Sequence, residues 1–183
     1  GKNGIGKNAE VVVYDEQISP LSSLLFWLME YFGHKKVSIY MEGLTGWTTA
    51  GYRTTETDTV IAEHTHDFDV AISPTSYKIT FQESKRLADN KEPVSGAFPR
   101  VWLVSSPNVP ETVPVKEYKH VSWKANLGDK GEIKSAYDLW TLYEAAGISK
   151  FSEVVCYSDS VQEATFTYFI LRVLGFPNVR VYL

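Results

Sequence analysis

Cysteine is nearly absent from this sequence, since Cys156 is the only one among 183 residues. A single cysteine excludes an internal disulfide and fits a reducing, intracellular compartment. A basic excess is also lacking, because 18 lysines and arginines face 22 acidic residues and the net charge is −4. Such a charge is not typical of a nucleic-acid-binding protein, so we expect no nucleic-acid partner.

Long apolar runs are missing as well. No stretch of about 18 consecutive apolar residues occurs, and the sequence therefore predicts no transmembrane helix. No secretory signal pattern is visible in it either. The hydrophobic fraction of 44% is nevertheless enough to supply the core of a globular protein.

The sequence does contain an internal repeat. Residues 12–41 read VVYDEQISPLSSLLFWLMEYFGHKKVSIYM, and residues 154–183 read VVCYSDSVQEATFTYFILRVLGFPNVRVYL. The two segments align without a gap, with Gly33 on Gly175 and Val37 on Val179. Each predicts a short buried strand, a polar loop, a helix that ends at glycine, and a second strand.

The remaining elements are predicted from apolar runs and turn residues. Strands are expected at 101–104 and 120–123, helices at 81–88 and 135–146, and a connector at 48–59. Alternating strands and helices predict the α/β class, with parallel sheets and right-handed crossovers.

Two parts of the chain resemble the two-domain rhodanese and 3-mercaptopyruvate sulfurtransferase family. The first is VVVYD, an aromatic-rich helix and FGHKKVSIYMEGLTGW, which is similar to the closing half of that family's first domain. The second comprises HVSWKANL, KGEI and LGFPNVRVY, which are similar to most of its second domain. The resemblance implies a rhodanese-like tandem with parallel sheets flanked by helices. It implies the closing half of an incomplete first domain at 1–58, a connector at 59–95, and a second domain lacking its C-terminal end at 96–183.

The resemblance also implies a site. Family members form a persulfide on a cysteine that ends a strand and opens a six-residue loop, and they transfer sulfane sulfur from thiosulfate or 3-mercaptopyruvate to a thiol. The family pattern VVTYC falls on VVCYS here, so Ser158 stands at the nucleophile position. The corresponding loop consists of Ser158, Asp159, Ser160, Val161, Gln162 and Glu163.

This loop is expected to be degenerate, with no catalytic residue. A serine hydroxyl cannot carry a sulfane sulfur, and its pKa is far too high for backbone N–H groups to produce the anion. Val161 replaces a glycine of the family, and Asp159 and Glu163 place negative charge where an anionic donor arrives. We expect Ser160 and Glu163 to form a capping box at the helix start. The loop of the first copy, 15–20, lacks cysteine too.

Other interpretations stay open at this point. An active sulfurtransferase with an atypical loop is the alternative, with Cys156 as nucleophile, although Cys156 lies two residues earlier and inside the strand. Binding of a small anion or peptide at the old pocket is a third interpretation, against which the acidic loop argues. His64, His66 and Asp69 are too few ligands for a metal site, and we expect no metal or cofactor.

The leading interpretation is a catalytically inactive protein that serves as a structural or docking subunit of a larger intracellular assembly, mitochondrial by analogy with two-domain relatives. The helix at 20–32 is apolar on all sides, which predicts a protein interface at Phe26, Trp27 and Leu28. The helix at 161–174 is expected to turn its polar side chains to water. We expect other protein subunits as partners and no small-molecule substrate.

Overall fold

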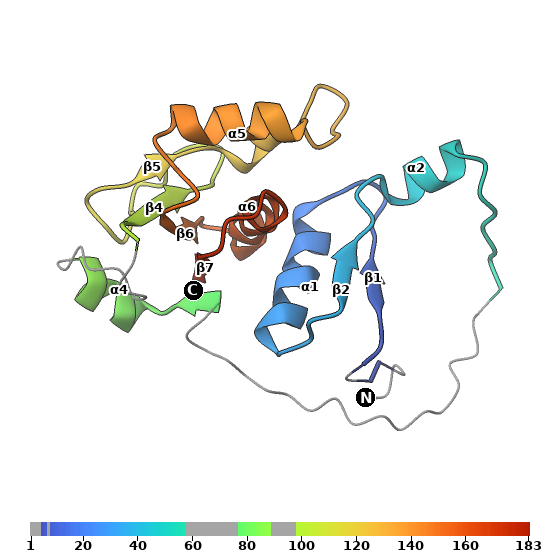
Figure 1. Cartoon of the computed structure of the whole chain (residues 1–183), viewed down its shortest axis with the longest axis horizontal. Helices are drawn as coiled ribbons and strands as arrows, with labels where there is room; N and C mark the ends of the chain where they lie inside the picture. The colour runs from blue at the N-terminus through green and yellow to red at the C-terminus, as the bar shows by residue number, and fades with distance from the viewer. Residues whose placement is uncertain (1–4, 7, 58–76, 89–97) are drawn as a thin grey trace. The chain divides into compact units, whose positions relative to one another are not determined.

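The computed structural model of the protein describes residues 5–6, 8–57, 77–88 and 98–183. The chain divides into two compact units, Gly1–Ser73 and Pro74–Leu183. Every paired strand in both units is parallel to its neighbour, which confirms the predicted α/β class. Figure 1 shows the elements of both units.

Unit 1 is a β-α-β segment followed by a short helix. Its elements are β1 (Val11–Val13), α1 (Pro20–Tyr31), β2 (Val37–Ile39) and α2 (Gly43–Thr49). The two strands pair in parallel, with Val11 opposite Val37. The Ser19 side chain accepts two backbone N–H groups of the first turn of α1, and Gly33, with φ of 87°, follows its end.

The sequence did not predict α2, because glycine and threonine have low helix propensity. Its first turn is held by the loop that follows β1. The backbone N–H groups of Leu44 and Thr45 donate to the carbonyl oxygens of Asp15 and Glu16, at 2.9 and 3.0 Å. These hydrogen bonds satisfy donors that a helix N-terminus otherwise leaves free, so tertiary contacts rather than propensity stabilise α2.

Unit 2 is built on a five-stranded parallel sheet with the order β3-β7-β6-β4-β5. Its strands are β3 (Lys78–Ile79), β4 (Arg100–Val104), β5 (Lys119–His120), β6 (Glu153–Tyr157) and β7 (Val179–Tyr182). Its helices are α4 (Phe81–Ala88), a 3-10 turn η1 (Trp123–Asn126), α5 (Ala136–Ala145) and α6 (Val161–Val173).

The limits of unit 2 differ from the sequence-based domain limits, which place a connector at 59–95. The difference arises because β3 pairs with β7, with Ile79 opposite Tyr182. Ile79 is fully buried and contacts Trp102 and Val155 in the core. A two-residue strand carries too little periodicity to be seen in the sequence.

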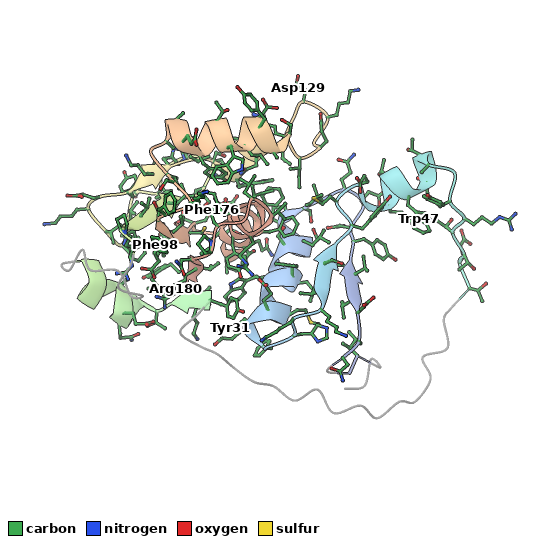
Figure 2. The ribbon with its side chains drawn as sticks, viewed as in Figure 1. Tyr31, Trp47, Phe98, Asp129, Phe176 and Arg180 are labelled. Carbon is green, nitrogen blue, oxygen red and sulfur yellow. The ribbon has the colours of Figure 1, made fainter. Side chains whose placement is uncertain are left out.

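The core of unit 2 lies between the central strands and the helices. Leu103, Val154 and Val181, on three neighbouring strands, are all fully buried. Figure 2 labels Phe176, which follows α6 and whose ring stacks on Trp140 of α5 with centroids 5.1 Å apart. These contacts position α6, and therefore the loop that precedes it.

One expectation about α6 is wrong. Its polar side chains do not form a face turned to water, since Thr165 and Thr167 are fully buried and Gln162 and Glu163 are half-buried. Burial of Thr165 is possible because its hydroxyl donates to the helix's own carbonyl at Gln162, at 2.9 Å.

The repeat is visible in both units, but its alignment needs one correction. Val37 and Val179 are equivalent in the gapless alignment, yet Val37 pairs with Val11 whereas Val179 pairs with Val154. The first strand is therefore shifted by one residue, and VVVYD of the first copy lies on VVCYS of the second. The loop before the helix absorbs the difference.

Candidate functional site

Ser158 lies where two neighbouring strands end. It follows β6 directly, and Ser106 lies just beyond the end of β4, which pairs with β6. Because the strands are parallel, their carboxyl ends share one edge of the sheet, the edge at which α/β proteins place their sites. The two hydroxyl oxygens are 2.8 Å apart, and both residues are buried.

The hydroxyl group of Ser158 has no free hydrogen-bonding capacity. It donates to Glu163 Oε2 at 2.6 Å, and the backbone N–H of Ser160 donates to it at 3.3 Å. Since a hydroxyl has one hydrogen, the bond with Ser106 must be donated by Ser106. One donor and two acceptor positions are thus all used. The Ser158 hydroxyl therefore holds the loop together through three hydrogen bonds, and no lone pair of its oxygen is free to attack a substrate.

Glu163 links Ser158 to a residue that is distant in the sequence. Its second oxygen, Oε1, accepts the indole N–H of Trp123 at 3.0 Å. Trp123 belongs to η1 and packs edge-on against Phe166 of α6, with centroids 5.3 Å apart. The carboxylate is therefore fixed on both sides, and it points to Ser158 rather than to the helix N-terminus.

The predicted capping box is wrong. The Ser160 side chain accepts no backbone N–H of α6. Glu163 is occupied by Ser158 and Trp123 instead, as described above. Only the backbone carbonyl of Ser160 takes part in starting the helix, by accepting the N–H of Glu163 at 3.1 Å. Charge-assisted tertiary hydrogen bonds are stronger than a local cap, which explains the difference.

The rest of the loop is closed by local contacts. The N–H of Asp159 donates to the hydroxyl oxygen of Ser106 at 3.4 Å, and its carboxylate accepts the Tyr157 hydroxyl at 3.3 Å. Partial burial, and then the charge of Asp159, raise the pKa of Tyr157. Val161 adopts no left-handed conformation, since only glycines have positive φ among the described residues. The loop therefore does not use the backbone freedom that glycine would give.

A histidine reaches the loop but does not contact Ser158 in any hydrogen bond that the structure shows, and the sequence did not identify it as a member of the site. His120 ends β5, and its Nε2 lies 2.9 Å from the backbone carbonyl of Ser106. That contact positions the end of β4. It does not make His120 a base for Ser158, whose hydroxyl donates to Glu163.

Cys156, the alternative nucleophile, is part of the core. It lies within β6 between Leu103 and Val181 on the adjacent strands, and it is fully buried. Burial raises the pKa of its thiol. A buried thiol in such surroundings stays protonated and behaves as a small apolar side chain.

The first copy of the repeat has an equivalent loop, in which the carboxylate stands at the strand end and the serine at the start of the helix. After the one-residue shift, Asp15 occupies the place of Ser158 at the strand end. Asp15 accepts the hydroxyl of Ser19, and this hydrogen bond, followed by one from the Glu16 backbone, lowers the pKa of Asp15. Each loop thus contains one carboxylate bound by one serine, and neither contains a thiol.

The three residues of the predicted protein interface on α1 differ in how far they are buried. Phe26 and Trp27 are buried and Leu28 is half-buried, whereas Leu21 and Leu25 of the same helix are exposed. The interface stays a prediction.

His64, His66 and Asp69 lie outside the described residues. Within the described ranges, no group of three potential metal ligands is found. In the same ranges, no helix combines the length and the apolar character needed to cross a bilayer.

Comparison with known proteins finds similar proteins that are named as sulfurtransferases or as a sulfur carrier. The chain is 26% identical over 200 residues to the sulfur carrier protein TtuD of Thermus thermophilus, covering 98% of this chain and 67% of that protein. It is 24% identical over 184 residues to 3-mercaptopyruvate sulfurtransferase of Escherichia coli K12, covering 98% and 64%. The chain thus spans about two thirds of the length of the curated relatives it matches. No family model matches the sequence.

Solved structures give the same fold. The structure of the 3-mercaptopyruvate sulfotransferase SseA from Escherichia coli, described as having the "rhodanese" fold, matches with a TM-score of 0.76. The match has 21% sequence identity and covers 98% of this chain and 67% of SseA. The fold predicted from the sequence is therefore confirmed.

Proposed function

We infer that the chain is related to two-domain rhodanese and 3-mercaptopyruvate sulfurtransferases, with which it shares its fold and about a quarter of its residues, so the chemistry expected of it is sulfur transfer through a cysteine persulfide. We propose that this chain lacks that chemistry and serves as a structural or docking subunit of a larger assembly. The observation that carries the proposal is the state of Ser158, whose hydroxyl is bound by Glu163, Ser106 and the backbone of Ser160.

The chemical argument has two parts. Sulfur transfer needs a thiolate at the loop, because the thiolate is the nucleophile that takes the sulfane sulfur. Ser158 offers an oxygen whose lone pairs are already used, and Glu163 places a negative charge at 2.6 Å from it. An anionic donor such as thiosulfate would meet repulsion from that charge, instead of the positive field such a donor requires.

An active enzyme is the second candidate, and the names of the relatives favour it. In that case Cys156 would have to act, since it is the only cysteine. Its complete burial between neighbouring strands argues against access by thiosulfate or 3-mercaptopyruvate. The two candidates make opposite predictions about one variant, Cys156→Ala.

A cyanide-to-thiocyanate assay decides between them. With thiosulfate and with 3-mercaptopyruvate as donors, we expect the wild-type chain to form thiocyanate no faster than buffer, with an authentic sulfurtransferase as positive control. Turnover well above buffer that disappears in Cys156→Ala would assign the activity to Cys156 and contradict the proposal.

The docking part of the proposal has a separate test. Native size-exclusion chromatography of a lysate from the source cells is expected to show the protein in fractions far larger than its own monomer, whose mass is read from a denaturing gel of the same lysate. The purified recombinant chain, run as a matched control, should elute alone at low mass. Elution of the cellular protein as a monomer would contradict docking without affecting the assay for sulfur transfer. On α1 we keep Phe26, Trp27 and Leu28 as the proposed interface.

A further inference from the structure

Two fully buried polar residues of unit 2 pair with each other beside the candidate site. Asn126 ends η1 and Tyr143 lies in α5, and both are completely shielded from water. The Tyr143 hydroxyl donates to Asn126 Oδ1 at 2.6 Å. Burial of polar groups is unfavourable unless they are paired, and apolar side chains would fill the same space without that constraint. The pair therefore calls for an explanation beyond packing.

The hydrogen bonds of Asn126 can run in one direction only. Its amide nitrogen, Nδ2, donates to the backbone carbonyl of Trp123 at 2.8 Å. A carbonyl accepts and never donates, so the amide nitrogen must face Trp123 and the amide oxygen must face Tyr143. Burial raises the pKa of Tyr143, which keeps its hydroxyl protonated as the donor. Tyr143 thus fixes which way the Asn126 amide points.

Trp123 is the residue that this amide holds in place. Its backbone N–H donates to the Ser105 carbonyl at 2.8 Å, and its backbone carbonyl accepts from Asn126. Its ring packs edge-on against Phe166, as described above. The remaining polar group, the indole N–H, donates to Glu163 Oε1 at 3.0 Å. Both ends of the Trp123 backbone are therefore anchored, and this anchoring directs the indole toward Glu163.

These contacts form one series that leads from α5 to the loop after β6. It runs from Tyr143 through Asn126, Trp123 and Glu163 to Ser158, with donor–acceptor distances of 2.6, 2.8, 3.0 and 2.6 Å. All five residues belong to unit 2. Networks of hydrogen bonds and packed side chains of this kind are what carries energetic coupling between separate parts of a protein.

Glu163 would have another favourable position without this support. It is the third residue of α6, where a glutamate ordinarily reaches back to the backbone N–H that precedes the helix. The N-terminus of a helix attracts negative charge as well. The carboxylate nevertheless turns to Ser158 and Trp123. A fixed indole donor explains this preference, because it adds a second hydrogen bond to the one that Ser158 donates.

We propose that Tyr143 and Asn126 are positioning residues of the Ser158 loop, which act through Trp123 to hold the Glu163 carboxylate against Ser158. This inference rests on the proposed inactivity, and it names the part of the fold that maintains the state of Ser158. A change in the buried face of α5 should therefore alter the electrostatics at the carboxyl end of β6, several residues away along the series.

A thiol at position 158 reports where the Glu163 carboxylate lies. In Ser158→Cys, a carboxylate held beside the thiol disfavours the thiolate, and release of that carboxylate lets the thiol pKa fall. The pKa is measured on the intact 183-residue chain from the rate of iodoacetamide alkylation as a function of pH. We expect Tyr143→Phe, added to Ser158→Cys, to lower the thiol pKa by about 0.5 or more. The matched control is Tyr137→Phe, which deletes a hydroxyl from the same helix at a residue 79% exposed and should leave the pKa unchanged.

Combined variants separate action through Trp123 from a general loosening of the unit. In the same Ser158→Cys chain, Trp123→Phe removes the indole donor directly and should lower the thiol pKa as much as Tyr143→Phe does. Adding Tyr143→Phe to Trp123→Phe should lower it no further, because both changes interrupt one series. Should Tyr143→Phe fail to fold, Tyr143→Phe with Asn126→Leu removes the unpaired amide oxygen too, and it should give the same fall in pKa.

Three results would overturn the proposal. The first is a thiol pKa that Tyr143→Phe leaves unchanged, which would make Asn126 and Tyr143 a packing pair only. The second is an equal fall in Tyr137→Phe, and the third is a fall from Tyr143→Phe that adds fully to that of Trp123→Phe. Thiocyanate formation by the wild-type chain, by contrast, would contradict the proposed inactivity and leave the result on Tyr143 standing.

Discussion

The hydroxyl oxygen of Ser158 lies 2.6 Å from a carboxylate oxygen of Glu163. The two residues come from the end of β6 and the first turn of α6, and the contact closes the loop between them. At the position where the resemblance to sulfurtransferases predicts a nucleophilic cysteine, this chain places a hydroxyl bound to a negative charge. Restoring the cysteine alone would therefore not restore the electrostatics.

The first prediction follows directly. In Ser158→Cys the new thiol would lie against the Glu163 carboxylate, and a neighbouring like charge disfavours the thiolate. We expect its pKa to exceed the ordinary value of about 8.5, and to fall when Glu163→Gln is added. The rate of iodoacetamide alkylation between about pH 6 and 10 measures both values. Equal pKa values in the single and double variants would show that Glu163 does not control the site.

The second prediction separates the two serines of the loop. Ser158→Ala removes three hydrogen bonds and leaves the Glu163 carboxylate short of a donor, which should cost about 1–3 kcal/mol of unfolding free energy. Ser160→Ala is the matched control. It should cost less than about 0.5 kcal/mol, because the Ser160 side chain makes no cap hydrogen bond. Urea denaturation followed by tryptophan fluorescence measures both. A larger loss in Ser160→Ala would mean that it caps α6 after all.

The third prediction concerns the thiol of Cys156. Its complete burial in β6 should prevent reaction with a maleimide or with DTNB in the native protein, at neutral pH and up to about pH 9. The same reagent should modify one thiol per chain once guanidinium chloride unfolds the protein. Fast stoichiometric labelling under native conditions would contradict the burial and would strengthen the enzyme interpretation.

The sequence predicted the helices and strands that are determined by residues close together in the chain. The apolar run 153–157 and the glycine after each repeat helix located β6, α1 and α6 closely. It could not reveal that Glu163 binds Trp123, because the two residues are 40 positions apart and a capping box explains the local pattern equally well. Ser106 was missed as a member of the site for the same reason, since it meets Ser158 only through the pairing of β4 with β6.

The repeat was more informative than its alignment. Alignment of the two copies identified the equivalent helices and second strands. It misaligned the first strands by one residue, because valines match valines in either alignment. Only the pairing of Val11 with Val37, against that of Val154 with Val179, determines which register is correct. In that register Asp15 stands in the place of Ser158.

The fourth prediction concerns a buried ion cluster in unit 2. Glu153 accepts Arg100 Nη2 at 2.8 Å through one oxygen and Arg180 Nη1 at 3.3 Å through the other, and all three side chains are at most 5% exposed. Figure 2 labels Arg180. Glu153→Ala leaves two buried cations without this partner, which should cost about 3–5 kcal/mol of stability. Glu144→Ala, at an exposed residue of α5, is the control and should change the urea midpoint little. Similar midpoints for the two variants would show that the cluster is not coupled to folding.

The last prediction compares two glycines of unit 1 that share a left-handed backbone. Gly43 has φ of +62° and Gly51 has φ of +80°. A Cβ atom at position 43 would lie 2.6 Å from the Glu16 carbonyl oxygen and 2.7 Å from that of Asp15, whereas at position 51 nothing lies within 4 Å.

Both alanine variants therefore carry the backbone cost of about 1–2 kcal/mol, but only Gly43→Ala must also displace the loop whose carbonyls hold the start of α2. We expect Gly43→Ala to lose at least about 1 kcal/mol more than Gly51→Ala, in line with the cost of overpacking. Hydrogen exchange of the Leu44 and Thr45 amides should report the same order, with faster exchange in Gly43→Ala. Equal losses in the two variants would mean that backbone strain alone explains the glycine, and that the loop after β1 does not anchor α2.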